Sequence, residues 1–131
     1  MIDFNNDFFL NCEVVDGIAK NIKAASEIFT DNASFFFPGV PETIGKRRIN
    51  FLLKGITSRY SSLKWEVKRE FYCKDKFDNS CLIAEWDVNG FFKTGKAYIN
   101  QGISVITFES VACEKIKHFK DYFVSTDFSD T

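Results

Sequence analysis

The sequence predicts an α+β fold in which N-terminal helices pack on one face of a curved, mainly antiparallel sheet. Up to Tyr60, apolar residues recur mostly at spacings of three and four, as on one face of a helix. From Leu63 onward the apolar period changes to two, which is the period of a strand. The 131 residues, of which 45% are hydrophobic, provide enough apolar material for one core. We therefore expect a single domain over residues 1–131.

Two helices are predicted near the N-terminus. A break between them is expected at Asp16-Gly17, because this pair favours a turn. The second helix is expected from Lys20 to Phe29, and Thr30–Ala33 is expected to form its exit turn. The apolar face of the pair comprises Phe8, Cys12, Val15, Ala19 and Ile22.

A short strand and a third helix are predicted next. The stretch SFFFPGVPETIG (34–45) predicts an apolar strand closed by Pro38 and Pro41, because proline does not fit the ladder of a central strand. A helix is predicted from Lys46 to Tyr60, and the basic residues at its start are expected to be solvated. Its apolar face comprises Ile49, Leu52, Leu53, Ile56 and Tyr60.

The rest of the chain predicts a meander of four strands. The turn signals KFDNS, KTG and ESVA separate segments of strand length and favour hairpin connections. The predicted strands span residues 64–75, 81–92, 96–110 and 113–124.

The composition excludes several classes of partner. A net charge of −1 provides no basic excess for binding nucleic acid. No apolar run is long enough to span a bilayer, and the N-terminal MIDFNNDFF carries acids where a secretory signal needs basic residues. We therefore expect a cytoplasmic protein with no nucleic-acid and no membrane partner.

The cysteines and the histidine predict no metal site, and no motif predicts a cofactor. Cys12, Cys73, Cys81 and Cys113 form no CxxC pair, and His118 is the one histidine. Reduced, mostly buried thiols are the expected state of the cysteines. Sixteen phenylalanines favour a large apolar interior between sheet and helices.

Asp121 is the most informative residue of the last strand. Strand alternation places Phe119, Asp121 and Phe123 on one face, and His118 on the other, where we expect it to point outward. An unpaired carboxylate between two phenylalanines is too costly to bury in ionised form. Either this face borders a cavity or the carboxylate has a hydrogen-bonding partner, such as the backbone or a tyrosine.

Two further acids lie on the second strand of the meander. Glu85 and Asp87 share a face, and Trp86 lies on the opposite one. If the acids face the interior with Asp121, the three form a coupled set in which at least one holds its proton above the usual pH range. Alternatively, Glu85 and Asp87 lie on a solvated face and pair with a basic residue, for which Lys68, Lys96 and Lys117 are candidates.

Four sequence segments resemble the nuclear transport factor 2-like superfamily, particularly its SnoaL-like and limonene-epoxide-hydrolase-like branches. The resemblance implies a cone, in which a bent sheet wraps three helices and a pocket opens between them. It also implies a homodimer, which we expect to form through the sheet face that bears Trp86. The four segments, in the order and spacing typical of these proteins, are IFTDNASFFFPG, IGKRRINFLLKGI, AEWDVNGFFKTGKAY and ITFESVACEKIKHFKDYF.

The resemblance to the epoxide hydrolases implies two pocket aspartates at Asp87 and Asp121. Glu85 stands where those enzymes have an arginine, and Phe35 and Phe37 stand where they hold a water with tyrosine and asparagine. We therefore expect no hydrolysis of terpene epoxides.

The resemblance to two other branches leaves one catalytic group in place. In the ketosteroid isomerases the general base would fall on Phe37 and the second acid on Ser104, so neither acid is present. The SnoaL-like cyclases have an aspartate that acts as general acid and base at the position of Asp121.

The sequence thus predicts a SnoaL-like protein with an apolar pocket for a small apolar molecule, and an acid/base enzyme of cyclase, isomerase or hydrolase type as its activity. The catalytic candidates are Asp121 and Asp87. The alternatives are a binding protein without catalysis and a dimeric interaction module with an incidental cavity. The expected ligand-binding residues are Glu85, Phe35, Phe37, Ser104, Phe119 and Phe123.

Overall fold

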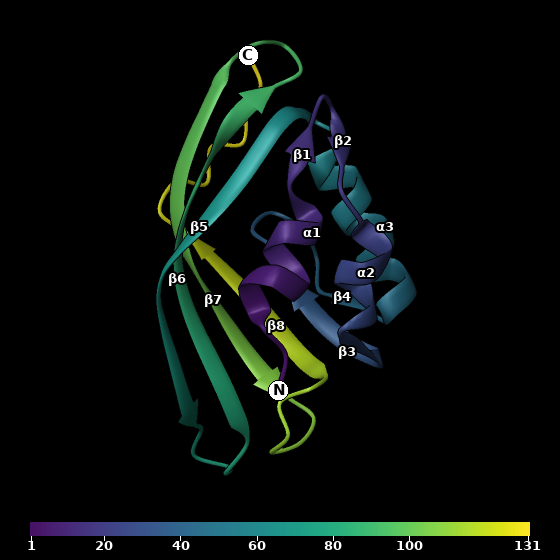
Figure 1. Ribbon diagram of the computed structural model, residues 1–131, viewed down its shortest axis with the longest axis vertical. Coiled ribbons are helices and arrows are strands. Elements are labelled where there is room, and N and C mark those ends of the chain that lie inside the picture. The colour runs from purple at the N-terminus through teal and green to yellow at the C-terminus, as the bar shows by residue number, and fades with distance from the viewer.

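A curled eight-stranded sheet wraps around short helices in the computed structural model, which describes residues 1–131 (Figure 1). The strand order is β2-β1-β5-β6-β7-β8-β3-β4, and every neighbouring pair is antiparallel except β3 and β8. The helical elements are η1 (Asn5–Phe9, a π-helix), α1 (Leu10–Cys12), α2 (Ile22–Glu27) and α3 (Lys46–Thr57). The strands are β1 (Val14–Val15), β2 (Ile18–Ala19), β3 (Phe29–Phe36), β4 (Thr43–Ile44), β5 (Tyr60–Lys74), β6 (Ser80–Phe92), β7 (Ala97–Phe108) and β8 (Ile116–Phe123).

The predicted α+β architecture and its meander are confirmed. Strands β5, β6, β7 and β8 are consecutive in the chain and adjacent in the sheet, as hairpin connections require. The helices lie on the concave side of this sheet (Figure 1). None of the helical elements combines the length and the apolar character that a membrane span requires.

The break predicted at Asp16-Gly17 is a hairpin turn rather than a joint between two helices. Both residues have positive φ, at 53° and 78°, as a two-residue type I′ turn requires. The turn joins β1 to β2, so Val15 and Ala19 belong to strands and not to a helical stripe. The second helix is α2, whose first turn is capped by the side chain of Asn21 through the backbone NH of Ala24.

The exit turn predicted at Thr30–Ala33 is wrong, because these residues lie inside β3. The pairing of β3 with β8 shifts register between Phe29 and Ser34, so a local irregularity occupies the place of the expected turn. The predicted end of this strand before Pro38 is confirmed. Helix α3 begins at Lys46 as predicted and ends at Thr57, since Tyr60 already belongs to β5.

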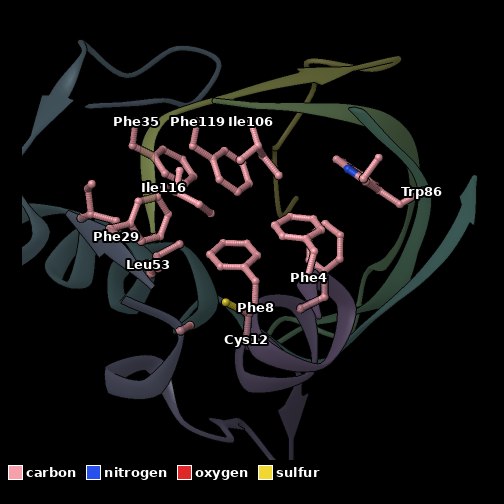
Figure 2. Close-up of a cluster of buried hydrophobic side chains, with 14 of the residues drawn as sticks. Phe4, Phe8, Cys12, Phe29, Phe35, Leu53, Trp86, Ile106, Ile116 and Phe119 are labelled. Atoms are coloured by element: carbon pink, nitrogen blue, oxygen red, sulfur yellow. The ribbon is translucent and has the colours of Figure 1, made fainter. Parts of the chain in front are cut away.

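Phenylalanines from the helical and sheet layers form the centre of the core. In Figure 2, Phe35 of β3 and Phe119 of β8 face Phe8 of η1. The ring centroids of Phe35 and Phe119 are 4.6 Å apart, and those of Phe8 and Phe119 are 5.0 Å apart. Each fully buried phenylalanine contributes about 1.5 to 3 kcal/mol, so this cluster holds the N-terminal helix against the sheet.

Candidate functional site

A small apolar cavity lies between the helices and the concave face of the sheet. Its volume is about 40 Å³, which is room for one or two water molecules. Asp121 supplies the one carboxyl group in its wall. The lining residues are Phe8, Phe9, Cys12, Phe35, Phe37, Leu53, Ile56, Thr57, Trp65, Asp121 and Phe123.

The register of three strands places a hydrogen-bonded chain behind Asp121. Ser104 of β7 lies directly opposite Asp121 of β8, and its hydroxyl donates to Asp121 Oδ1 at 2.6 Å. The indole NH of Trp86 on β6 donates to Ser104 Oγ at 3.0 Å. Because Ser104 Oγ accepts from Trp86, its own proton is directed to the carboxylate. Both Ser104 and Trp86 are buried, so this arrangement is fixed by packing.

Desolvation controls the protonation of Asp121. The residue is intermediate in overall exposure, but its carboxyl group lies among apolar side chains. Burial raises the pKa of Asp121 to about 7, although the hydrogen bond from Ser104 acts in the opposite direction. Near neutral pH the carboxyl group is therefore present in both its acid and its base form.

Cys12 supplies a thiol to the same cavity wall. Burial, and then the negative charge of Asp121, raise the pKa of the Cys12 thiol well above its ordinary value. A protonated buried thiol is a poor nucleophile, so Cys12 serves as an apolar wall residue. Cys12, Cys81 and Cys113 are free and buried as predicted, whereas Cys73 is exposed.

Glu85 and Asp87 do not share the interior with Asp121, so that interpretation of the three acids is wrong. The guanidinium of Arg69 bonds to Glu85 through Nη2–Oε2 at 2.7 Å and Nε–Oε1 at 3.3 Å. Lys68 Nζ lies 3.6 Å from Asp87 Oδ2. The pairing of Glu85 and Asp87 with basic residues on the outer face is therefore the arrangement in the structure, and Lys68 is among the predicted partners.

Trp86 points inward, which also corrects the predicted dimer face. Its side chain is 1% exposed in the single chain, so it is not available to a second subunit. Figure 2 shows it on the concave side of the sheet. The alternation along β6 is as predicted, but its inner and outer faces are exchanged. Ala84, Ser104 and Asp121 lie in register across β6, β7 and β8, and this row fixes the even-numbered residues of β6 as inner.

The other predicted ligand-binding residues divide into two groups. Phe35, Phe37 and Phe123 line the cavity beside Asp121. Phe119 is fully buried beneath Phe35, and Ser104 lies behind Asp121, so neither of these two is in the cavity wall.

Several wall residues were not identified as site residues from the sequence. Phe8 and Cys12 had been recognised only as members of a helical apolar stripe. Trp65 on β5 stacks on Phe9 at a centroid distance of 5.1 Å, which closes one side of the cavity. A tryptophan and a phenylalanine far apart in the chain carry no local sequence signal for this contact.

His118 lies outside the site, as predicted from its opposite parity to Asp121. Its side chain is exposed, and its Nδ1 hydrogen-bonds to Ser34 Oγ on the neighbouring strand β3. Neither His118 nor Ser34 lines the cavity that holds Asp121.

Solved structures similar to this chain share its fold at low sequence identity. A hexachlorocyclohexane dehydrochlorinase (LinA) type 2 aligns with a TM-score of 0.78 and 12% identity, over 94% of this chain and 82% of its own. A protein with a ketosteroid isomerase-like fold from Catenulispora acidiphila DSM 44928, in complex with trimethylamine, aligns with a TM-score of 0.72 and 10% identity, over 92% of this chain and 84% of its own. An NTF2-like protein of unknown function from Exiguobacterium sp. 255-15 aligns with a TM-score of 0.71 and 16% identity, over 92% of this chain and 98% of its own.

The structural comparison finds similar proteins where the sequence comparisons find none. No family model matches the chain, and no curated protein matches it. The structural matches therefore support the conclusion, and they confirm the fold that the four sequence segments implied. The chain has the nuclear transport factor 2-like fold, a cone of α+β type.

Proposed function

We propose that this protein is an acid/base enzyme in which Asp121 transfers a proton to or from a small apolar molecule. The observation that supports this most directly is a single carboxyl group, with a pKa of about 7, in the wall of an apolar cavity. A group whose pKa lies near the working pH is the most effective proton-transfer catalyst. Among the similar solved structures, one is described as a dehydrochlorinase and another as a hypothetical protein with a ketosteroid isomerase-like fold.

The hydrogen-bonded chain supports a defined role for each oxygen of the carboxyl group. Ser104 holds Asp121 Oδ1, so Oδ2 is the oxygen available to a ligand in the cavity. Trp86 orients the Ser104 hydroxyl. The hydrogen bond from Ser104 stabilises the ionised form of Asp121, which is the form present before Asp121 takes up a proton and after it releases one. These two residues position the carboxylate and do not touch the ligand.

A single carboxyl group favours some reactions over others. Activation of water between two aspartates is not available, because Asp87 is paired with Lys68 on the outer face. Asp121 alone can abstract a proton from carbon and return it elsewhere on the same molecule. We therefore propose an isomerisation or a cyclisation, or an elimination in which Asp121 keeps the proton while a leaving group departs with the bonding electrons. The expectation that terpene epoxides are not hydrolysed is unchanged.

Binding without catalysis is the second candidate, because the small cavity beside Asp121 leaves little room for a reaction on a ligand of ordinary size. Pockets for small-molecule ligands usually measure about 300 to 1,000 Å³, which far exceeds the cavity beside Asp121. A ligand of ordinary size must displace side chains such as Phe37 to reach the carboxyl group. In this role Asp121 would donate one hydrogen bond to a polar group of an otherwise apolar ligand.

A homodimer remains part of the proposal, through the convex face of the sheet. Phe71 of β5, Ile103 of β7 and Tyr122 of β8 share this face and are 48%, 37% and 51% exposed. Apolar side chains in such a group favour cover by a partner.

The state of the cysteines bears on the location of the protein. The free thiols of Cys12 and Cys81 fit the reducing cytoplasm, which is the location that the sequence predicts for the protein.

Proton exchange with solvent tests the enzymatic proposal. Small cyclic ketones are incubated with the protein in D₂O, and deuterium incorporation next to the carbonyl is followed by NMR. We expect exchange with the wild type and background exchange with Asp121→Asn, because asparagine cannot take up the proton. Exchange that persists in Asp121→Asn contradicts the role of Asp121. Retention of a ketone without exchange supports binding alone.

A further inference from the structure

An apolar groove lies immediately outside the cavity that holds Asp121. Its volume is about 370 Å³, which falls in the range of small-molecule sites. It runs between α3, the loop after β3 and the C-terminal segment. The lining residues are Phe37, Pro38, Val40, Phe51, Leu52, Gly55, Ile56, Arg59, Tyr60 and Phe128.

The groove and the cavity are separated by very little protein. Phe37 and Ile56 line both spaces, so one side of each residue faces the groove and the other faces the cavity. The ring of Phe37 packs against Phe123 at 5.2 Å and against Phe128 at 5.4 Å. A rotation of the Phe37 side chain, with displacement of Phe128, would join the two spaces into one elongated site.

Arg59 supplies the one charge in the wall of this groove. Its guanidinium lies over the ring of Phe92, with Cζ 5.2 Å from the ring centroid. Its Nη2 donates to the backbone carbonyl of Phe128 at 2.6 Å and lies 4.0 Å from the carboxylate of Asp130. The wall is otherwise apolar or uncharged, so the groove combines a long apolar surface with a single fixed cation.

The C-terminal segment 124–131 places an aromatic ring and a carboxylate at this groove. Phe128 contributes the ring in the groove wall, and Asp130 contributes the carboxylate near Arg59. The segment has no regular secondary structure and is held by side chains at its edge. Lys96 Nζ donates to Ser129 O at 2.8 Å, and Thr94 Oγ1 donates to Asp130 O at 2.6 Å.

We propose that the groove is the outer part of the ligand site, and that it takes an elongated apolar molecule with one anionic group. The anion binds Arg59, the apolar body lies along α3 in place of Phe128, and the far end reaches Asp121 past Phe37. The tail residues Phe128 and Asp130 are then an internal substitute for this ligand in the free protein. This inference rests on the proposed function only for the reaction at the far end.

Two dyes with nearly the same apolar scaffold test the proposal. 8-Anilinonaphthalene-1-sulfonate carries an anion, and N-phenyl-1-naphthylamine is its neutral counterpart. The affinity of each dye is measured by fluorescence titration for the full-length wild type and for Arg59→Met. We expect Arg59→Met to weaken the binding of the anionic dye about tenfold or more, because a charge-assisted hydrogen bond is lost. The affinity for the neutral dye should change by less than about twofold.

Matched variants locate the binding site. Arg47→Met, which removes an exposed arginine of α3 outside the groove, should leave both affinities unchanged. Phe128→Ala should strengthen the binding of both dyes, because it removes the side chain that occupies the groove in the free protein. If Arg59→Met proves to be unfolded, Val40→Glu decides instead, since it adds a negative charge at an exposed loop position of the groove and should weaken the anionic dye alone.

The contrary results are equally defined. The groove proposal is overturned if Arg59→Met weakens the binding of both dyes equally. It is also overturned if a folded Arg59→Met or Val40→Glu binds the anionic dye with unchanged affinity. The dye titrations depend on Arg59 and the proton-exchange assay depends on Asp121, so the failure of one proposal leaves the test of the other intact.

Discussion

At the scale of the residue, burial of the Asp121 carboxyl group makes the stability of the fold depend on pH. Folding raises its pKa from an ordinary value of 3.8 to about 7, so the folded state binds the proton more tightly than the unfolded state. This stabilising proton uptake is complete below the unfolded pKa and is lost as pH rises through the folded one. The wild type should therefore lose stability between pH 4 and pH 7, relative to a variant that cannot ionise at this position.

Asp121→Asn should consequently be more stable than the wild type at pH 8 and similar to it at pH 4. We expect a gain of about 1 to 4 kcal/mol at pH 8, since one pKa unit corresponds to about 1.4 kcal/mol. Asparagine keeps an acceptor for the Ser104 hydroxyl. Chemical unfolding of both proteins across this pH range measures the difference. A large loss of stability in Asp121→Asn would instead identify a paired structural carboxylate.

Ser104→Ala should raise the pKa of Asp121 further, because the Ser104 hydrogen bond lowers it. A rise of about one to two units is expected from loss of a hydrogen bond to a charged group. The same change leaves the Trp86 NH without its partner and should cost about 1 to 3 kcal/mol. Carbon-13 NMR of the Asp121 carboxyl group measures the pKa directly. An unchanged pKa in a folded Ser104→Ala would show that Ser104 does not stabilise the carboxylate.

At the scale of the element, the sequence predicted the strands but not which face of β6 is inner. Period-two alternation tells which residues share a face, and both faces of β6 carry apolar side chains. Which of the two faces of β6 is inner depends on its register with β7, where Gly102 lies opposite Trp86. The absence of a side chain at Gly102 leaves space for the indole. The N-terminal hairpin was missed for another reason, since strands of two residues carry no periodic signal.

Substitutions at two glycines should give opposite results. A Cβ at Gly102 would lie 2.4 Å from Tyr122 O and 2.6 Å from the Trp86 ring, so Gly102→Ala should destabilise by about 1 to 3 kcal/mol. A Cβ at Gly55 in α3 meets nothing within 4 Å, so Gly55→Ala should stabilise by about 0.5 to 1 kcal/mol. Thermal unfolding of both variants distinguishes them. A tolerated Gly102→Ala would mean that β6 and β7 are not held in this register.

At the scale of the whole molecule, the order of weak motifs was enough to predict the cone, whereas the cavity was not predictable in size. Helix-then-strand order and hairpin turns constrain topology strongly, because few arrangements of these elements bury one core. The volume beside Asp121 depends instead on how rings such as Phe37, Phe123 and Phe128 pack together. Those contacts join residues from three separate parts of the chain, and no local pattern records them.

The convex face of the sheet carries the last prediction, which concerns assembly. If a second copy covers Phe71, Ile103 and Tyr122, the wild type should sediment as a dimer at micromolar concentration. Ile103→Glu places a second carboxylate beside Glu85, its register neighbour on β6, and should yield monomers. Dimerisation also stabilises the fold by mass action, so Ile103→Glu should unfold at a lower temperature and lose the concentration dependence of unfolding. Ile18→Glu, at an exposed position of the β1–β2 hairpin, should leave the dimer intact. A monomeric wild type would show that this apolar face does not serve self-association.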